Sequence, residues 1–112
     1  MAVMLASARS DEHGKAKYGA AGDQTGREVM IQAWYPHEKE WFVLRAIDPA
    51  KRALIAQAAI AAAKNENIGY DQSERNDLYA VAKRFGFDPS KVDEKVEADC
   101  SALVRVACEF AG

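Results

Sequence analysis

The sequence is poor in cysteine and has no long apolar run. Its two cysteines, Cys100 and Cys108, stand eight positions apart, which is roughly 12 Å along a helix and too far for a disulfide bond. A disulfide framework is therefore excluded, and the pair fits synthesis in a reducing cytosol. No apolar stretch approaches the roughly 20 residues that a membrane-crossing helix needs, so we expect no membrane partner.

An excess of either charge is also lacking. The formal net charge is -2 at pH 7 and no block of like charge appears, so we expect no nucleic-acid partner. Histidine, cysteine and acidic residues do not cluster at the spacing of metal ligands, so neither a metal site nor another cofactor is expected. With 49% hydrophobic and 29% charged residues, the 112 residues form a single folded domain or part of one.

Glycines, by contrast, are concentrated near the N-terminus. Four of the seven lie within thirteen positions and predict a glycine-rich arm over residues 1–27: Gly14, Gly19, Gly22 and Gly26. Such an arm is either flexible or ordered close to a ligand.

A β-hairpin is expected over residues 28–47. Residues 29–35 and 41–47 are rich in β-branched and aromatic side chains, and residues 36–40 between them have turn composition. Four aromatic residues surround the turn, and they either stack on sugars or pack onto the domain: Trp34, Tyr35, Trp41 and Phe42.

Residues 48–112 have the pattern of a helical half. Asp48 and Pro49 predict the start of a helix that runs to about Lys64, because aspartate caps a helix and proline suits its first position. Gly86 is expected to end the next helix. The remaining expected elements are a connector at 68–72 and helices over 73–85, 89–96 and 100–111.

Cys100 is the candidate nucleophile. Asp99 is the expected N-cap of the helix over 100–111, which places the Cys100 sulfur at the positive end of the helix dipole, where a nucleophilic thiolate is favoured. The alternative is a small buried hydrophobic residue. Cys108 is expected to lie in the core.

The segment Asp99–Val104, Asp-Cys-Ser-Ala-Leu-Val, resembles the nucleophile motif of NlpC-type peptidoglycan hydrolases, Asp-Cys-Ser-small-Leu-Val. Ile68–Tyr70 resembles the Gly-x-Pro-Tyr segment of the same superfamily, without its proline and the Trp-Gly-Gly that follows it. Together with residues 21–29, these segments are similar to a set found in prophage-encoded cell-wall hydrolases related to the NlpC-type and CHAP enzymes.

The resemblance implies an α+β, papain-like cysteine peptidase fold, of which the chain would hold the helical half and an N-terminal β-hairpin. It implies that Cys100 attacks amide or peptide bonds of peptidoglycan, with the stem peptide as the partner. It also implies substrate contacts from five residues: Tyr70, Asp99, Ser101, Asp23 and Gln24. Since residues 1–6 do not have the pattern of a signal peptide, we expect synthesis in the bacterial cytoplasm and action at the cell wall after release or export.

The histidine of the resembling families lies on a strand after the nucleophile helix. His13 and His37 both precede Cys100, so we expect the base to lie outside these 112 residues and the chain alone to be inactive. The alternative is a non-catalytic module that binds wall fragments or a protein partner. Without the missing sheet, the apolar face of the 100–111 helix is expected to be uncovered and to favour self-association.

Overall fold

The described part of the chain contains helices and two small two-stranded sheets, so the fold belongs to the α+β class, as predicted. The computed structural model describes residues 4–8, 10–15, 19–34, 44–72 and 74–112. The elements in chain order are β1 (Met4–Ala8), β2 (Val29–Ala33), α1 (Pro49–Lys64), β3 (Ile68–Tyr70), α2 (Asp77–Lys83), the 3₁₀ helix η1 (Pro89–Lys91), β4 (Val96–Ala98) and α3 (Cys100–Ala111).

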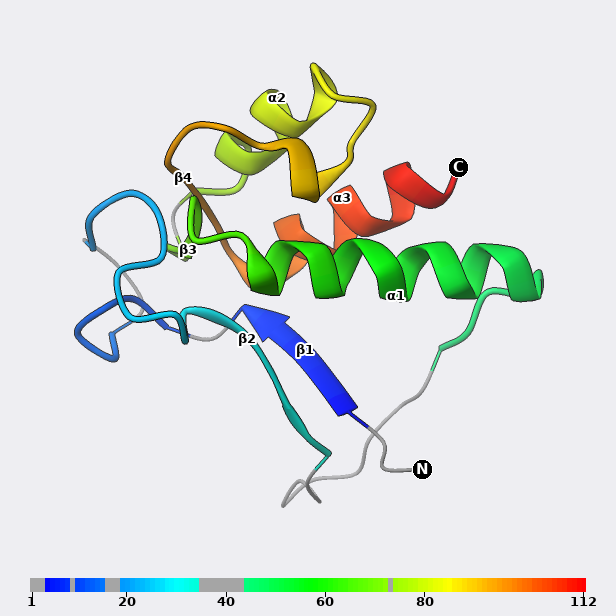
Figure 1. Ribbon diagram of the computed structural model, residues 1–112, viewed down its shortest axis with the longest axis horizontal. Coiled ribbons are helices and arrows are strands. Elements are labelled where there is room, and N and C mark those ends of the chain that lie inside the picture. Colours follow the sequence, from blue (N-terminus) through cyan, green and yellow to red (C-terminus); the bar gives the residue numbers. More distant parts are fainter. Residues whose placement is uncertain (1–3, 9, 16–18, 35–43, 73) are drawn as a thin grey trace.

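Helix α1 is the centre of the arrangement. The antiparallel pair β1–β2 covers one side of α1, while α3 packs on its other side and α2 packs in turn on α3 (Figure 1). Strands β3 and β4 form a parallel pair near the end of α1, with Tyr70 opposite Ala98. Within the described residues, the strands therefore form two separate two-stranded sheets.

The start of α1 confirms the prediction made from the sequence. The Asp48 carboxylate accepts a hydrogen bond of 2.8 Å from the Ala50 amide, and Pro49 occupies the first turn. Ala58 and Ala62 are the buried residues of this helix. Their small side chains allow close approach of the neighbouring elements, which explains why an alanine-rich helix lies in the middle of the fold.

The expected hairpin differs from what the structure contains. Strand β2 pairs with β1, with Met4 opposite Ala33 and Ala8 opposite Val29. Residues 44–47 belong to no strand, and the rest of the expected hairpin after β2, from the end of its first strand to the start of its second (35–43), lies outside the described part. The partner of β2 thus comes from the expected glycine-rich arm, where a five-residue strand was not predicted.

Two expected helices are shorter than their patterns suggested. Helix α2 covers Asp77–Lys83 and not 73–85, while η1 covers Pro89–Lys91 and does not reach residue 96. The reason for the second difference is that Val96 begins β4, whose partner β3 occupies the expected connector. Gly86, with a φ of 66°, follows α2 closely, in agreement with its expected role in ending a helix.

The apolar face of α3 is covered, contrary to expectation. Leu103 is 4% exposed and Val106 is fully buried, because α1 and α2 pack against this helix. The reason for expecting self-association through this face therefore does not hold. Cys108 was expected in the core but is exposed.

A close backbone contact joins the N-terminal loop to β3. A Cβ atom at Gly69 would collide with the Gly22 carbonyl oxygen and would lie 2.9 Å from Glu28 Oε1. The Gly22 amide also donates to the Val96 carbonyl at 3.2 Å. The loop therefore lies across both strands of the parallel pair, and this requires glycine at position 69.

Replacing Gly69 should disrupt this contact. We expect Gly69→Ala to lower the free energy of unfolding by about 3 kcal/mol, because the added methyl group displaces the loop backbone. Gly14→Ala is the control, since a Cβ there meets no atom within 4 Å and only its positive φ costs about 1 kcal/mol. Urea denaturation measures both, and equal losses would contradict the packing described here.

Candidate active site

The carboxyl ends of β3 and β4 meet at one edge. Asp71 follows β3, and its amide continues the ladder by donating to the Ala98 carbonyl at 3.3 Å. Asp99 and Cys100 follow β4 directly. Because parallel strands end at the same side of a sheet, four residues gather there, and we call this set the carboxyl edge: Tyr70, Asp71, Asp99 and Cys100.

Cys100 is the first residue of α3, as predicted, and its side chain is exposed. Asp99 is the N-cap: its Oδ1 atom accepts the Ala102 amide at 2.7 Å and the Ser101 hydroxyl at 2.8 Å. These bonds fix the first turn of α3 through the Ala102 amide and the Ser101 hydroxyl, and the Cys100 residue lies exposed at the N-terminus of the helix.

The second oxygen of Asp99 faces Arg75. Arg75 Nε lies 3.4 Å from Asp99 Oδ2, and the side chains are 73% and 7% exposed, respectively. The capping carboxylate is thus a buried member of the carboxyl edge, whereas its cationic partner lies at the surface. Arg75 was not among the predicted site residues, and its ordinary position between a connector and a helix contained no signal of this contact.

Tyr70 lies beside the nucleophile candidate. It is 8% exposed, and burial raises the pKa of its hydroxyl, with further increases from the negative charges of Cys100, Asp99 and Asp71. The phenol therefore remains protonated at neutral pH and is available as a hydrogen-bond donor. The structure brings Tyr70, Asp99, Cys100 and Ser101 together, and their roles toward a substrate stay predictions.

Asp23 and Gln24 organise the loop before β2. Asp23 Oδ1 accepts the amides of Thr25 at 3.1 Å and of Gly26 at 2.8 Å. Gln24 Nε2 donates to the Gly22 carbonyl at 2.9 Å. The Asp23 carboxylate and the Gln24 side-chain amide thus stabilise, through hydrogen bonds to its backbone, the loop that crosses β3 and β4. A contact with substrate stays a prediction for both residues.

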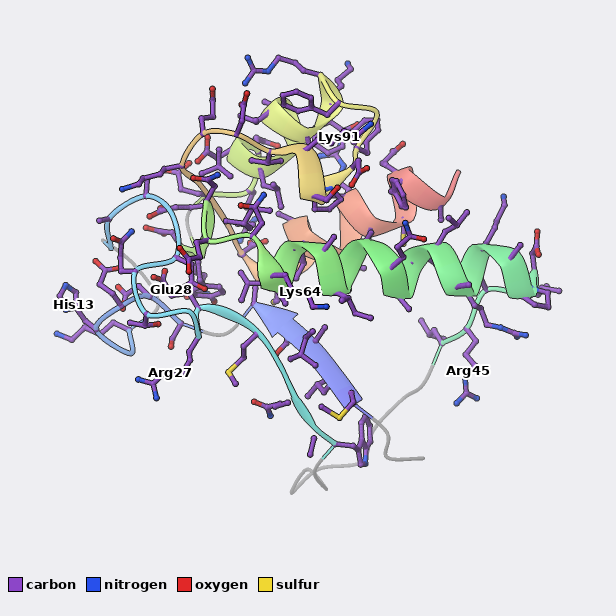
Figure 2. All side chains as sticks on the ribbon, in the orientation of Figure 1. His13, Arg27, Glu28, Arg45, Lys64 and Lys91 are labelled. Carbon is purple, nitrogen blue, oxygen red and sulfur yellow. The ribbon has the colours of Figure 1, made fainter. Side chains whose placement is uncertain are left out.

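Glu28 connects this loop to the carboxyl edge and was not among the predicted site residues. It is 1% exposed; its Oε1 accepts the Tyr70 amide at 3.1 Å and its Oε2 accepts the Gln24 amide at 2.6 Å. Glu28 lies where the loop meets β3 (Figure 2). Burial raises its pKa, although the two amide bonds act in the opposite direction. An acidic residue directly before an apolar strand was the available signal.

Glu97 is a second buried acid that was missed. It lies in β4, is 6% exposed, and its amide donates to Asp77 Oδ2 at 2.8 Å. Its Oε1 atom has no hydrogen-bond partner within the described part of the chain. Burial raises its pKa to about 7, and four acidic neighbours add to this shift: Asp71, Glu74, Asp77 and Glu28.

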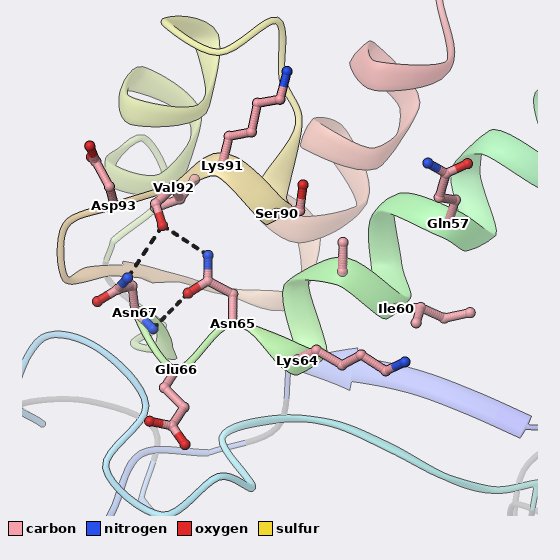
Figure 3. Close-up of a pocket in the computed structure, with 11 residues that line it drawn as sticks. Gln57, Ile60, Lys64, Asn65, Glu66, Asn67, Ser90, Lys91, Val92 and Asp93 are labelled. Atoms are coloured by element: carbon pink, nitrogen blue, oxygen red, sulfur yellow. Dashed lines mark hydrogen bonds between the residues drawn. The ribbon is translucent and has the colours of Figure 1, made fainter.

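A groove of about 860 Å³ lies between the second half of α1 and residues 90–93 (Figure 3). Its wall is braced by amide side chains: Asn65 Nδ2 and Asn67 Nδ2 donate to the Val92 carbonyl at 2.9 and 3.3 Å. None of the predicted site residues lines this groove. It is therefore a surface feature separate from the carboxyl edge.

The histidines do not lie at the carboxyl edge as far as the structure describes them. His13 is on the outer side of the loop after β1 (Figure 2), 3.5 Å from Glu12, and His37 lies outside the described residues. Among the described residues, no group of three or more histidine, cysteine or acidic side chains is placed to hold a metal ion. No described helix is both long and apolar enough to cross a membrane.

Comparison with known proteins identifies the family. A family model described as an endolysin-like domain matches residues 5–112, which is nearly the whole chain. The chain belongs to the endolysin-like domain family. No curated protein and no solved structure matches it. Membership in this family relates the chain to phage functions at the cell wall and points to cell-wall hydrolysis. Peptidoglycan as the target is consistent with this membership.

The cap at Asp99 should contribute measurably to stability. We expect Asp99→Ala to lower the free energy of unfolding by about 2 kcal/mol, at the upper end for a helix cap, because the Ala102 amide and the Ser101 hydroxyl both lose their acceptor. The exposed Arg75 adds little.

Asp48→Ala at the start of α1 is the matched control, with an expected loss of about 1 kcal/mol for one exposed capping bond. Asp99→Asn should retain most of the stability because an amide oxygen can also cap. Urea denaturation of the three variants checks this order, and a loss for Asp99→Ala below that for Asp48→Ala would contradict it.

Proposed function

We propose that this endolysin-like domain carries the nucleophile of a cysteine peptidase or amidase that cleaves peptidoglycan. The proposal is supported above all by one observation: Cys100 is exposed at the capped start of α3, where β3 and β4 end and where Tyr70 lies beside it. The family match supports the cell wall as the site of action.

The chemistry follows from the requirements of amide hydrolysis. The Cys100 thiolate attacks the carbonyl carbon, the carbon–nitrogen bond breaks, the amine leaves with a proton, and water then hydrolyses the thioester. The amides of Cys100 and Ser101 come before the first amides of α3 that donate to the N-cap residue. Because the first amides of a helix have no acceptor within the helix, these two are suited to stabilise the oxyanion. The Tyr70 hydroxyl is a third candidate donor.

The proton transfers require a base near Cys100. We expect an imidazole in this role, as in the NlpC-type and CHAP enzymes that the motif resembles. Asp99 and Ser101 would contact the stem peptide beside the scissile bond, and Asp23 and Gln24 would contact it from the loop before β2. Action at the wall would follow release or export from the cytoplasm.

The two cysteines provide an internal comparison. Both are exposed on the same helix, but only Cys100 lies at its N-terminus. We expect iodoacetamide to modify Cys100 about tenfold faster than Cys108 at pH 6, because the positive end of the α3 dipole stabilises the negative charge of an attacking sulfur atom. Mass spectrometry of the labelled chain and of the gene's full-length product, between pH 5 and 9, measures both rates.

Equal rates for the two cysteines in both proteins would contradict the nucleophile assignment. In that case, retained binding to purified peptidoglycan would favour the non-catalytic module.

Hydrolysis tests the proposal directly. In the full-length product, Cys100→Ser should lower the release of new amine groups from purified peptidoglycan by at least about a thousandfold, as expected for loss of a nucleophile. Cys108→Ser should retain activity, since this residue lies about two turns from the carboxyl edge. Unchanged hydrolysis by the Cys100 variant would refute the proposal.

A further inference from the structure

Glu97 is surrounded by acidic groups from three parts of the chain. Asp71 follows β3, Glu74 precedes α2 and Asp77 is the first residue of that helix. Glu28 comes from the loop before β2. All four acidic groups raise the pKa of Glu97. We call these five residues the carboxyl cluster. Its central member is more than nine-tenths buried and has a carboxyl oxygen without a hydrogen-bond partner in the described part of the chain.

Arg75 and Lys95, two basic residues that adjoin parts of this cluster in sequence, have other contacts. Arg75, between Glu74 and Asn76 in sequence, pairs with Asp99. Lys95 precedes β4, and its aliphatic stem packs on Gly22. A Cβ atom added at Gly22 would lie 3.1 Å from Lys95 Cγ. No ion pair that the structure places among its described residues involves Glu97. The charge of an ionised Glu97 would therefore meet mainly negative charges.

Residues 74–77, which we call the clasp, contact both β4 and the helix cap. Asp77 Oδ2 accepts the Glu97 amide at 2.8 Å, and Arg75 lies 3.4 Å from Asp99 Oδ2. The clasp thus binds one residue of β4 and the N-cap next to Cys100. Because Glu74 and Asp77 also belong to the carboxyl cluster, the packing of the clasp and the charge of Glu97 are coupled.

We propose that Glu97 is a proton-controlled latch: its neutral carboxyl group allows the clasp to close on β4 and Asp99, and its ionised form repels the clasp and opens it. Opening would withdraw Arg75 from the cap and expose the Glu97 amide. The latch is a property of this fold and does not depend on whether Cys100 is a nucleophile.

The sign of the pH dependence follows from linkage. Glu97 has a pKa of about 7 in the closed form, above the ordinary value of about 4.3 that is expected once the group reaches water. The closed form therefore binds more protons between these values, so closure is most stable below them and weakens as pH rises toward 7. The equilibrium constant for opening should rise by about thirtyfold between pH 5 and pH 7 and then level off.

Amide hydrogen exchange of the whole chain, followed by NMR, tests the latch. After correction for the intrinsic exchange rate, protection of the Glu97 amide should fall about thirtyfold from pH 5 to pH 7. The Val106 amide in the middle of α3 should be more protected at each pH, because clasp opening is local. Equal protection of the two amides, or a Glu97 amide whose protection does not change with pH, would overturn the proposal.

Three variants separate the latch from general stability effects. Glu97→Gln is permanently neutral and should remove the pH dependence, whereas Glu66→Gln, at an exposed acid outside the cluster, should behave like the unmodified chain. Glu74→Gln removes one exposed charge that faces Glu97 and should reduce the fall in protection. This last variant tests the proposal even if Glu97→Gln does not fold, and an unreduced fall would count against the latch.

Discussion

The parallel pairing of β3 with β4 is the contact on which the candidate site depends. Each strand has only three residues, yet their pairing places the residue after β3 beside the start of α3. The chain leaves β3, passes through α2 and η1, and returns as β4. Because β4 runs parallel to β3, both strands end at the same edge. Without this pairing, Tyr70 and Cys100, thirty positions apart in sequence, would have no reason to lie together.

The two faces of this small sheet have different environments. Ile68, Tyr70, Val96 and Ala98 point into the hydrophobic core, whereas Gly69 and Glu97, opposite each other in register, lie on the face covered by the N-terminal loop. The apolar face provides stability and the acidic face provides sensitivity to charge. Because successive side chains of a strand point to opposite faces, the three residues of β4 contribute to both the apolar face and the acidic face.

Local signals in the sequence identified the helix starts but not the strand partners. Asp48 and Asp99 cap α1 and α3 as expected because a cap is determined by its immediate neighbours. Strands β3 and β4 are too short to have a recognisable pattern, and their pairing depends on residues far apart in sequence. The motif around Cys100 located the carboxyl edge, but Arg75 and Glu97 make tertiary contacts that no local pattern encodes. For Glu28, an acidic residue directly before an apolar strand was the available local signal, and its contact with Tyr70 was not encoded there.

Glu28 also protects the free edge of β3. An edge strand exposes amides that can pair with a strand from another molecule, which is a common route to aggregation. Here the amide of Tyr70 on that edge is already bound by the Glu28 carboxylate, and the Gly22 backbone covers Gly69. A folded-back side chain thus occupies the place of a third strand, so intermolecular sheet extension at β3 is blocked within the monomer itself.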